Sequence, residues 1–271
     1  MGSKVFFHAE DLLEKIRDRV VVVSDIHLTE VHDSRGQMLS DLINRLDPDQ
    51  VEYFVLLGDI FDFCFGASTY FKQKFKPIGD ELTQLARKGV RVVFLQGNHE
   101  FSLDELAWEG VDFVLSRDYQ LKLADDLSIS FTHGDRLGAP WHYKLYLAIT
   151  RSYWFRCAGL LCPQSLLDKL CLKISIGSRE KSSRSKIPHK TILKNMEQWL
   201  SKLGTEHGIV GHFHIPYQAN QPKKGKLLGL CSWDQPNALG FDGKNFYRYY
   251  FKGLGKPYLL RKVRSASKAG L

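Results

Sequence analysis

The chain has 271 residues, of which 44% are hydrophobic and 25% charged, a composition typical of a soluble globular protein. Its length suits one large domain with a full core, or two small domains. The N-terminal residues are mixed and charged, and no apolar run reaches about 18 residues, so we expect neither a secretory signal peptide nor a membrane-spanning helix.

The cysteines indicate a reducing environment. There are five of them, an odd number, and their spacings suit neither a zinc cluster nor a redox pair. Together with the lack of an export signal, this predicts a cytoplasmic protein in which the cysteines are small buried residues.

Five short apolar runs follow one another along the chain, and each stops abruptly at polar residues. Their β-branched and aromatic content is typical of strands buried on both faces. The runs are VVVSDIH (21–27), YFVLLGD (53–59), RVVFLQGNH (91–99), LSISFTHGD (127–135) and GIVGHFH (208–214). Helix-like segments at 40–47 and 79–89 separate the first three runs, and Gly89 closes the second. This alternation predicts an α/β core with a substantially parallel sheet.

The segment 141–190 interrupts this alternation between the fourth and fifth runs. It is aromatic and leucine-rich, and it carries ten Lys or Arg against two acidic residues, so the net charge of +8 is concentrated there. We interpret it as a helical cap inserted into a core formed by residues 1–140 and 191–260, and its basic excess indicates a local partner. The core is expected to close with an antiparallel hairpin around Asp242-Gly243, followed by a disordered tail, 261–271.

All five predicted strands end in side chains that can bind a metal ion. In an open α/β sheet, ligands collect beyond the carboxyl ends of the strands. Taken singly, each residue has an ordinary alternative, since an Asp after a strand is a common helix N-cap and Gly97-Asn98 could form a turn. Taken together, the five strand ends predict a dinuclear metal centre. Its candidate ligands are Asp25, His27, Asp59, Asn98, His133, His212 and His214.

The mixed set of Asp, Asn and His ligands indicates which ions and which reaction to expect. Such ligands favour Mn, Fe, Zn or Co over calcium, and the lack of thiolates argues against a structural zinc site. We take Mn as the preferred ion. Two such ions bridged by a carboxylate activate water and neutralise a phosphoryl group during in-line displacement. The predicted activity is hydrolysis of a phosphate ester or anhydride.

Five motifs, SDIHL, LLGDIFDF, GNHE, THGD and GHFH, together resemble the signature of the calcineurin-like metallophosphoesterases across residues 20–216. The resemblance implies a layered αββα sandwich of two sheets flanked by helices. It also implies one metal held by Asp25, His27, Asp59 and His214, and a second held by Asp59, Asn98, His133 and His212. By the same resemblance, the catalytic residue His99 would contact the phosphate and assist the leaving oxygen. Alternatively, His99 could orient Asp25 or Asp59, and Glu100 is expected to be structural.

GDIFDF lacks the Asp-Arg-Gly ending of Ser/Thr protein phosphatases, an insertion directly follows HGD, and a closing hairpin contains Trp233. In these features the chain is similar, within that superfamily, to the UDP-2,3-diacylglucosamine pyrophosphatases of lipid A biosynthesis. This resemblance implies cleavage of UDP-2,3-diacylglucosamine to UMP and 2,3-diacylglucosamine 1-phosphate. The chain departs from the best-known branch at His99 and Glu100, where that branch has Arg and Asp, and at Cys231-Ser232, which replace Gly-Asp.

The predicted cap is both apolar and cationic, which suits an amphiphilic nucleotide-lipid and contact with the anionic inner membrane surface. The protein would then be peripheral on the cytoplasmic membrane. Candidate substrate-binding residues are Tyr143, Arg151, Arg179, Lys181, Ser183 and Arg184.

Other interpretations of the cap stay open. Its leucines could simply pack onto the core, and its charges could form a solvated face. A nucleic-acid groove would also be basic and aromatic, and the alternative function is therefore a broad phosphodiesterase or nuclease. The high apolar content of the segment argues against nucleic acid. A binding protein without catalysis would lack ligands, whereas all seven are present, and no obligate protein partner is evident.

Overall fold

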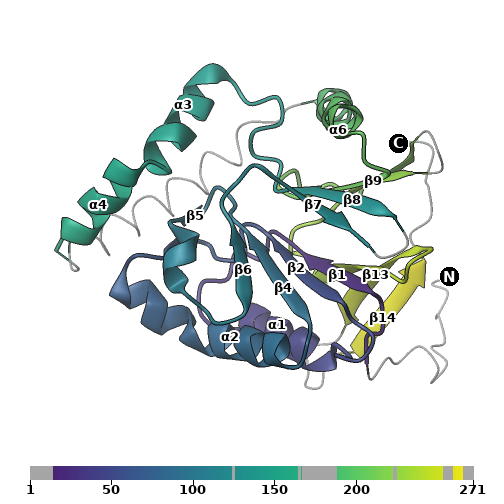
Figure 1. Cartoon of the computed structure of the whole chain (residues 1–271), viewed down its shortest axis with the longest axis horizontal. Coiled ribbons are helices and arrows are strands. Elements are labelled where there is room, and N and C mark those ends of the chain that lie inside the picture. Colours follow the sequence, from purple (N-terminus) through teal and green to yellow (C-terminus); the bar gives the residue numbers. More distant parts are fainter. Residues whose placement is uncertain are drawn as a thin grey trace, which may run out of the picture.

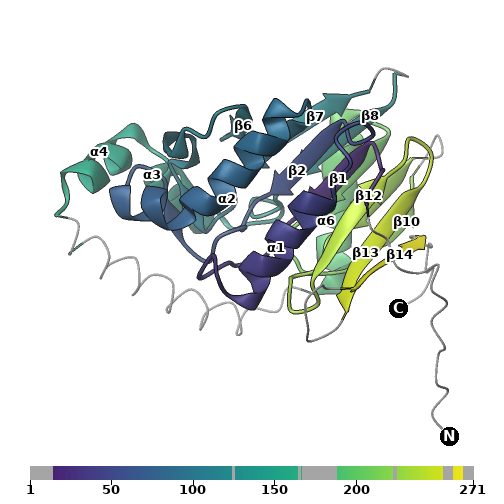
Figure 2. The same cartoon turned by 90° about the horizontal axis from the view of Figure 1, so that it is seen from below.

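Two β-sheets pack face to face, and helices cover their outer faces (Figures 1 and 2). The structure is a computed structural model that describes residues 15–123, 126–163, 166, 188–221, 225–252 and 259–264. The order across the seven-stranded sheet is β14 (Leu259–Arg264), β13 (Phe246–Lys252), β12 (Asn237–Phe241), β1 (Val20–Val23), β2 (Tyr53–Leu57), β4 (Arg91–Leu95) and β6 (Val111–Val114). The order across the five-stranded sheet is β10 (Gln218–Asn220), β11 (Lys226–Gly229), β9 (His207–Val210), β8 (Ser128–Thr132) and β7 (Asp118–Lys122).

The helices form the two outer layers. Helices α1 (Ser34–Arg45) and α2 (Thr69–Arg87) pack on the seven-stranded sheet, and α6 (His189–Leu203) packs on the five-stranded sheet. A small third sheet pairs β3 (Cys64–Phe65) with β5 (Glu100–Phe101), and a short 3₁₀ helix, η2, spans Leu103–Leu106. The described residues therefore form an α/β fold with four layers, as expected.

Strand β1 shows why the central strands are apolar throughout. Its side chains alternate, so that Val20 and Val22 enter the core between the two sheets, while Val21 and Val23 enter the core under α1 and α2. Strands β1, β2, β4 and β6 run parallel, as do β8, β9 and β11. The carboxyl ends of β1, β2 and β4 consequently lie at one edge of their sheet.

All five predicted strands are present, but the helices begin earlier than expected. Helix α1 begins at Ser34, where the side chain of Asp33 accepts a hydrogen bond from the backbone N–H of Gly36 at 2.8 Å. Helix α2 begins at Thr69 and ends just before Gly89, whose φ of 98° confirms its expected role after the helix end.

The C-terminal part confirms the hairpin and corrects the expected tail. Strands β12 and β13 pair in antiparallel fashion, and the Asp242 side chain accepts the N–H groups of Lys244 and Asn245 in the connecting turn. Strand β14 pairs with β13 as far as Arg264, so the prediction of disorder from residue 261 was wrong for 261–264. Residues 265–271 lie outside the described part of the chain.

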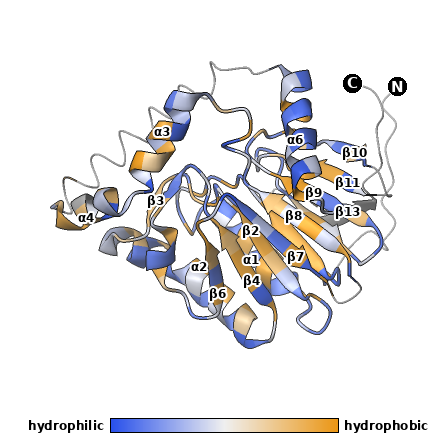
Figure 3. Cartoon of the chain, turned by 45° about the horizontal axis from the view of Figure 1, so that its top comes forward, coloured by the Kyte–Doolittle hydropathy of each residue, from blue (hydrophilic) through white to orange (hydrophobic). Residues whose placement is uncertain are grey.

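The described part of segment 141–190 consists mainly of helices α3 (Trp141–Thr150) and α4 (Tyr153–Leu161), which extend away from the layers in Figure 1. Several of their apolar side chains are exposed, including Trp141 (75%), Trp154 (79%) and Leu161 (85%), and Figure 3 shows hydrophobic stretches on both helices. The boundaries of a cap at 141 and 190 stay a prediction. None of the helices in the described ranges is long and apolar enough to cross a membrane.

His207, at the start of β9, is a buried histidine outside the predicted metal centre. Its ring lies against Phe241 and Phe246, and its Nδ1 accepts the backbone N–H of Lys226 at 2.9 Å. Burial, with a smaller contribution from the positive charge of Lys226, lowers the pKa of His207 to about 4. The folded protein therefore keeps this imidazole neutral.

We predict that His207 makes the free energy of unfolding depend on pH. The unfolded chain binds a proton at His207 below about pH 6.5, whereas the folded chain does so only near pH 4. The stability it contributes is complete above pH 6.5 and is lost as the pH falls toward 4. Between pH 7 and 5, the wild type should lose about 1–2 kcal/mol more than His207→Gln in chemical denaturation. His32→Gln, at an exposed position, is the control, and parallel curves for wild type and His207→Gln would contradict the prediction.

Candidate metal centre

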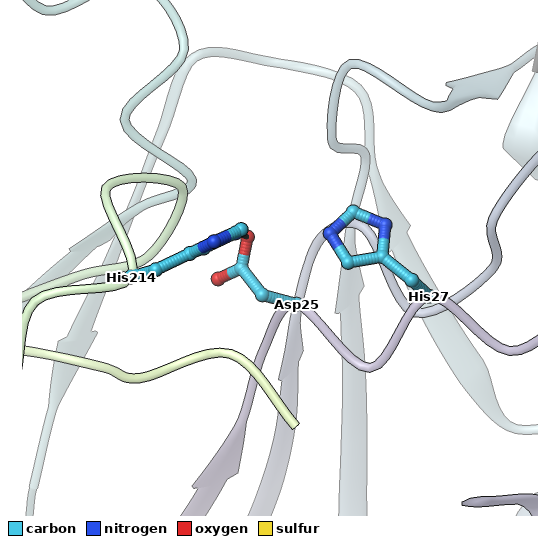
Figure 4. Close-up of side chains that lie close together, drawn as sticks. All are labelled: Asp25, His27 and His214. Atoms are coloured by element: carbon cyan, nitrogen blue, oxygen red, sulfur yellow. Dashed lines mark hydrogen bonds and ion pairs between the residues drawn. The ribbon is translucent and has the colours of Figure 1, made fainter. Parts of the chain in front are cut away.

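The predicted ligands from separate strands meet at one edge of the layered core. One group consists of Asp25, His27 and His214, and a second consists of Asp59, His133 and His212. Within each group, one ligand atom per residue lies within 4.8 Å of the others. Figure 4 shows Asp25 and His27 on the segment after β1, with the His214 ring directed toward the Asp25 carboxylate. The two groups coincide with the two ligand sets expected from the sequence, apart from Asn98 and the second use of Asp59.

Five of these residues adopt a left-handed backbone conformation, which residues other than glycine rarely do. The φ angles lie between 51° and 63° at Asp25, His27, Asp59, His212 and His214. Backbone hydrogen bonds between neighbouring strand ends hold part of this arrangement, from Asp25 N to Gly58 O and from His27 N to Asp59 O, both at 3.1 Å. Such strain persists where the surrounding structure fixes it, and it is concentrated at functional sites.

Asp25 is fully buried and is held as a carboxylate by donors on three sides. It accepts the Ser24 hydroxyl at 2.6 Å, the His212 backbone N–H at 2.9 Å and His214 Nε2 at 3.2 Å. Burial opposes ionisation, but the hydrogen bond from His214 and the charge of His133 outweigh it and lower the pKa of Asp25. Ser24 was not anticipated from the sequence, although it directly precedes the ligand in SDIHL.

The second group is organised around His133. Its Nδ1–H donates to the Leu57 carbonyl at 2.9 Å, which turns Nε2 toward Asp59 Oδ2 at 3.3 Å and Asn98 Oδ1 at 3.1 Å. Burial disfavours protonation of His133, but the Asp59 carboxylate outweighs it and raises the pKa to about 10. His212, beside it, has its pKa lowered to about 4 by burial and by His133.

These environments fit divalent metal ions. Carboxylate, amide and imidazole donors from different strands converge on a buried edge where positive charge is favoured, and the other ring nitrogen of His133 is fixed by a backbone carbonyl, as is usual for a metal-binding histidine. The donor sets are consistent with a dinuclear site.

Glu100 has the structural role expected for it. It is fully buried, and its two carboxylate oxygens accept four backbone N–H groups at 2.7–3.2 Å. The donors are Asp59, Ile60, Phe61 and Gly97. Glu100 therefore joins the loop that carries Asp59 to the loop that carries Asn98. Burial and the nearby Asp59 charge raise its pKa to about 7, while the N–H groups favour the ionised form.

His99 lies between the two groups. Its backbone N–H donates to Asp59 Oδ1 at 2.9 Å, and its Nδ1–H donates to the Asp62 carbonyl at 2.6 Å. The remaining nitrogen, Nε2, lies 3.9 Å from Asp59 Oδ2. Side chains of His27, Asp62 and His99 also form a third group that could bind an ion. Asp62 was not anticipated from the sequence, although it is the second aspartate of GDIFDF.

The structure describes only part of the candidate substrate-binding set. The Tyr143 side chain is partly buried, and burial raises its pKa, with smaller contributions from the negative charges of Asp135 and Asp59. Arg151 contacts the Gly97 carbonyl and Asp135. The other candidates, Arg179, Lys181, Ser183 and Arg184, lie outside the described residues.

Comparison with known proteins identifies related sequences over most of the chain. The model of the calcineurin-like phosphoesterase family matches residues 18–229. Two proteins from Haemophilus influenzae named UDP-2,3-diacylglucosamine hydrolase are 28% (strain PittGG) and 31% (strain Rd) identical, each over 71% of this chain and 81% of its own length. The zinc complex of Vps29 from Entamoeba histolytica aligns over 91% of this chain and 99% of its own, at 12% identity. The TM-score of this alignment is 0.45.

Glu100→Ala should destabilise the metal-free fold strongly. The substitution leaves four buried backbone N–H groups without their acceptor, and each unsatisfied group costs about 1–3 kcal/mol. We expect the free energy of unfolding in EDTA to fall by at least about 3 kcal/mol in chemical denaturation. Glu109→Ala is the control, because it removes an exposed glutamate paired with Arg87. It should change the free energy of unfolding by less than about 1 kcal/mol. Equal losses of unfolding free energy in the two variants would show that Glu100 does not fix the loops that carry Asp59 and Asn98.

Proposed function

Since the chain belongs to the calcineurin-like phosphoesterase family, we propose that it cleaves the pyrophosphate bond of UDP-2,3-diacylglucosamine to UMP and 2,3-diacylglucosamine 1-phosphate. The observation that carries the reaction type is the meeting of two His/Asp groups at one buried edge. The choice of substrate is supported by the relatives named UDP-2,3-diacylglucosamine hydrolase, of which this chain covers most of the length.

In this proposal, Asp25, His27, Asp59 and His214 hold one divalent ion, and Asp59, Asn98, His133 and His212 hold the other. Mn is the proposed ion. When bound, the two ions supply Lewis-acid activation of the attacking water and neutralise charge on the phosphoryl group. The protein fixes the donors beforehand, because the Leu57 carbonyl orients His133, and Ser24 together with the His212 N–H orients Asp25.

His99 acts as the proton donor to the leaving oxygen. Its Nδ1–H is engaged by the Asp62 carbonyl, so Nε2 is the nitrogen that faces the centre. Burial opposes protonation, but the Asp59 charge and the Asp62 carbonyl raise the pKa of His99. An imidazole, whose usual pKa is about 6.5, can supply a proton at neutral pH. Water attacks the phosphorus on the nucleotide side, and the bond between this phosphorus and the bridging oxygen breaks. Nε2 of His99 transfers its proton to that oxygen.

Helices α3 and α4 belong to a cap that binds the lipid part of the substrate and contacts the inner membrane surface. Their exposed apolar side chains, among them Trp141, Trp154 and Leu161, support an amphiphilic ligand. Arg151 at the end of α3 and Arg156 on α4 are paired with acidic side chains, so these two charges are not free to contact a nucleic-acid backbone.

Release of UMP from UDP-2,3-diacylglucosamine in the presence of Mn²⁺ tests the substrate. We expect rapid release that EDTA abolishes, with poor cleavage of bis-p-nitrophenyl phosphate under the same conditions. Diester cleavage without UMP release would be consistent with a phosphoesterase centre, but it would contradict the proposed lipid-nucleotide substrate. Binding to DNA or RNA that weakens steeply with salt would then favour the phosphodiesterase or nuclease alternative.

Substitutions at Asp59 and His99 separate metal binding from proton transfer. Asp59→Ala removes the proposed bridging ligand and should abolish metal-dependent turnover. His99→Ala should lower kcat by about 10²–10⁴ while the purified protein retains both ions, because it removes only the proton donor. Metal content and kcat measured on the same preparation check this. Full activity in His99→Ala would rule out the acid role and leave His99 as a residue that orients Asp59.

A further inference from the structure

Arg151 ends helix α3 and buries its guanidinium against the loops that carry the metal-binding side chains. Its side chain is only 11% exposed. One terminal nitrogen, Nη2, donates to the Gly97 carbonyl oxygen at 2.8 Å and to Asp135 Oδ2 at 3.2 Å. The two acceptors belong to segments that follow different strands, β4 and β8, in different sheets. The guanidinium therefore connects the edges of both sheets at the centre.

Both contacts lie close to candidate ligands of the second metal position. The Gly97 carbonyl belongs to the peptide bond that leads directly into Asn98, and Asp135 is two residues beyond His133. Asn98 Oδ1 and His133 Nε2 are 3.1 Å apart, so small movements of either segment change the space between the two donors. Metal affinity is sensitive to such groups beyond the ligands, because they fix where the donor atoms lie.

Gly97 packs closely against the loop that carries Asp59. A Cβ atom on this residue would lie 2.3 Å from Asp59 Oδ1, and its N–H donates to Glu100 at 2.7 Å. Glu100 thus holds the peptide on one side of Gly97, and Arg151 holds the peptide on the other side. Glu100 fixes this loop relative to Asp59, whereas Arg151 fixes it relative to the segment that carries His133.

We propose that Arg151 is a positioning residue that sets the separation of Asn98 and His133 and thereby the affinity of the second metal position. The proposal rests on the metal ligands assigned in the proposed function, and it adds that Arg151 regulates how the same centre is occupied. Because Arg151 ends helix α3, the affinity of the second metal position depends on how this helix packs against the core. Contacts made by α3 are in this way connected to the occupancy of the centre.

The chemistry of arginine suits this role. Both contacts come from the N–H groups of Nη2, whose directions are fixed by the plane of the guanidinium, whereas a lysine ammonium acts as a point charge. Arg156, on α4, offers a contrast, since it is more exposed and pairs with Asp104 and Glu105.

Mn²⁺ binding to the purified full chain tests the proposal through Arg151→Met, Arg151→Lys and the control Arg156→Met. Calorimetric titration gives the affinity of each equivalent, and electron paramagnetic resonance distinguishes an exchange-coupled Mn pair from isolated ions. In Arg151→Met, we expect the first equivalent to bind as in the wild type and the second to bind about 10- to 100-fold more weakly. In this variant, the resonance signal of the exchange-coupled Mn pair should be lost at two equivalents of Mn²⁺. Both this signal and kcat should return at high Mn²⁺ concentration. Arg151→Lys should be intermediate, and Arg156→Met should match the wild type.

The outcomes separate this proposal from the assignment on which it rests. If the wild type binds fewer than two Mn²⁺ ions, the dinuclear assignment fails, and the positioning role fails with it. If the wild type binds two and Arg151→Met binds both with unchanged affinity, the dinuclear centre stands and Arg151 does not position it. If turnover stays low in Arg151→Met when both ions are bound, Arg151 acts on the substrate and the proposal is wrong. Should Arg151→Met fail to fold, Arg151→Lys decides, because an unchanged second affinity in that variant overturns the proposal equally.

Discussion

Two aspartates, Asp25 and Asp59, are almost completely buried and yet have pKa values held below the usual range. Removing a carboxylate from water is expensive unless positive charge and hydrogen-bond donors replace the solvent. The strand ends provide both, through histidine side chains and backbone N–H groups. The arrangement of the edge depends on this requirement, because each loop has to bring a donor or a positive charge to one of the two carboxylates.

Glu100 is a buried carboxylate that is stabilised by different donors. Its four donors are backbone N–H groups, which cannot dissociate or move away. Asp25 and Asp59 also accept backbone N–H groups, but in addition they contact the imidazoles of His214 and His133, whose charge can be replaced by that of a metal ion. The contrast distinguishes a carboxylate that holds the loops together from two that are suited to binding a metal ion, although all three lie within one small region.

The sequence predicted most of the layers and ligand positions because of how the central strands are buried. Strands such as β1 contact a core on both faces and are therefore apolar throughout, so the polar residues that end them stand out. The left-handed backbone at five of these residues could not be predicted, since it depends on hydrogen bonds between strands distant in sequence. Strand β14 was missed for a similar reason: its basic composition suggested a tail, and only pairing with β13 makes it a strand.

The two-residue strand β5 has a consequence for how this protein could diversify. Its neighbours point to opposite faces, so Glu100 is directed toward the metal-bearing loops while Phe101 contacts Phe155 on α4. Phe155 also lies against Phe65, in the partner strand β3. The outer surface of α4 can therefore change in evolution without disturbing β5, provided that its aromatic contact at Phe155 is kept. Through this aromatic contact, and through the contacts of Arg151 with Gly97 and Asp135, the helices are joined to the loops of the centre, and changes elsewhere on their surface leave these connections intact.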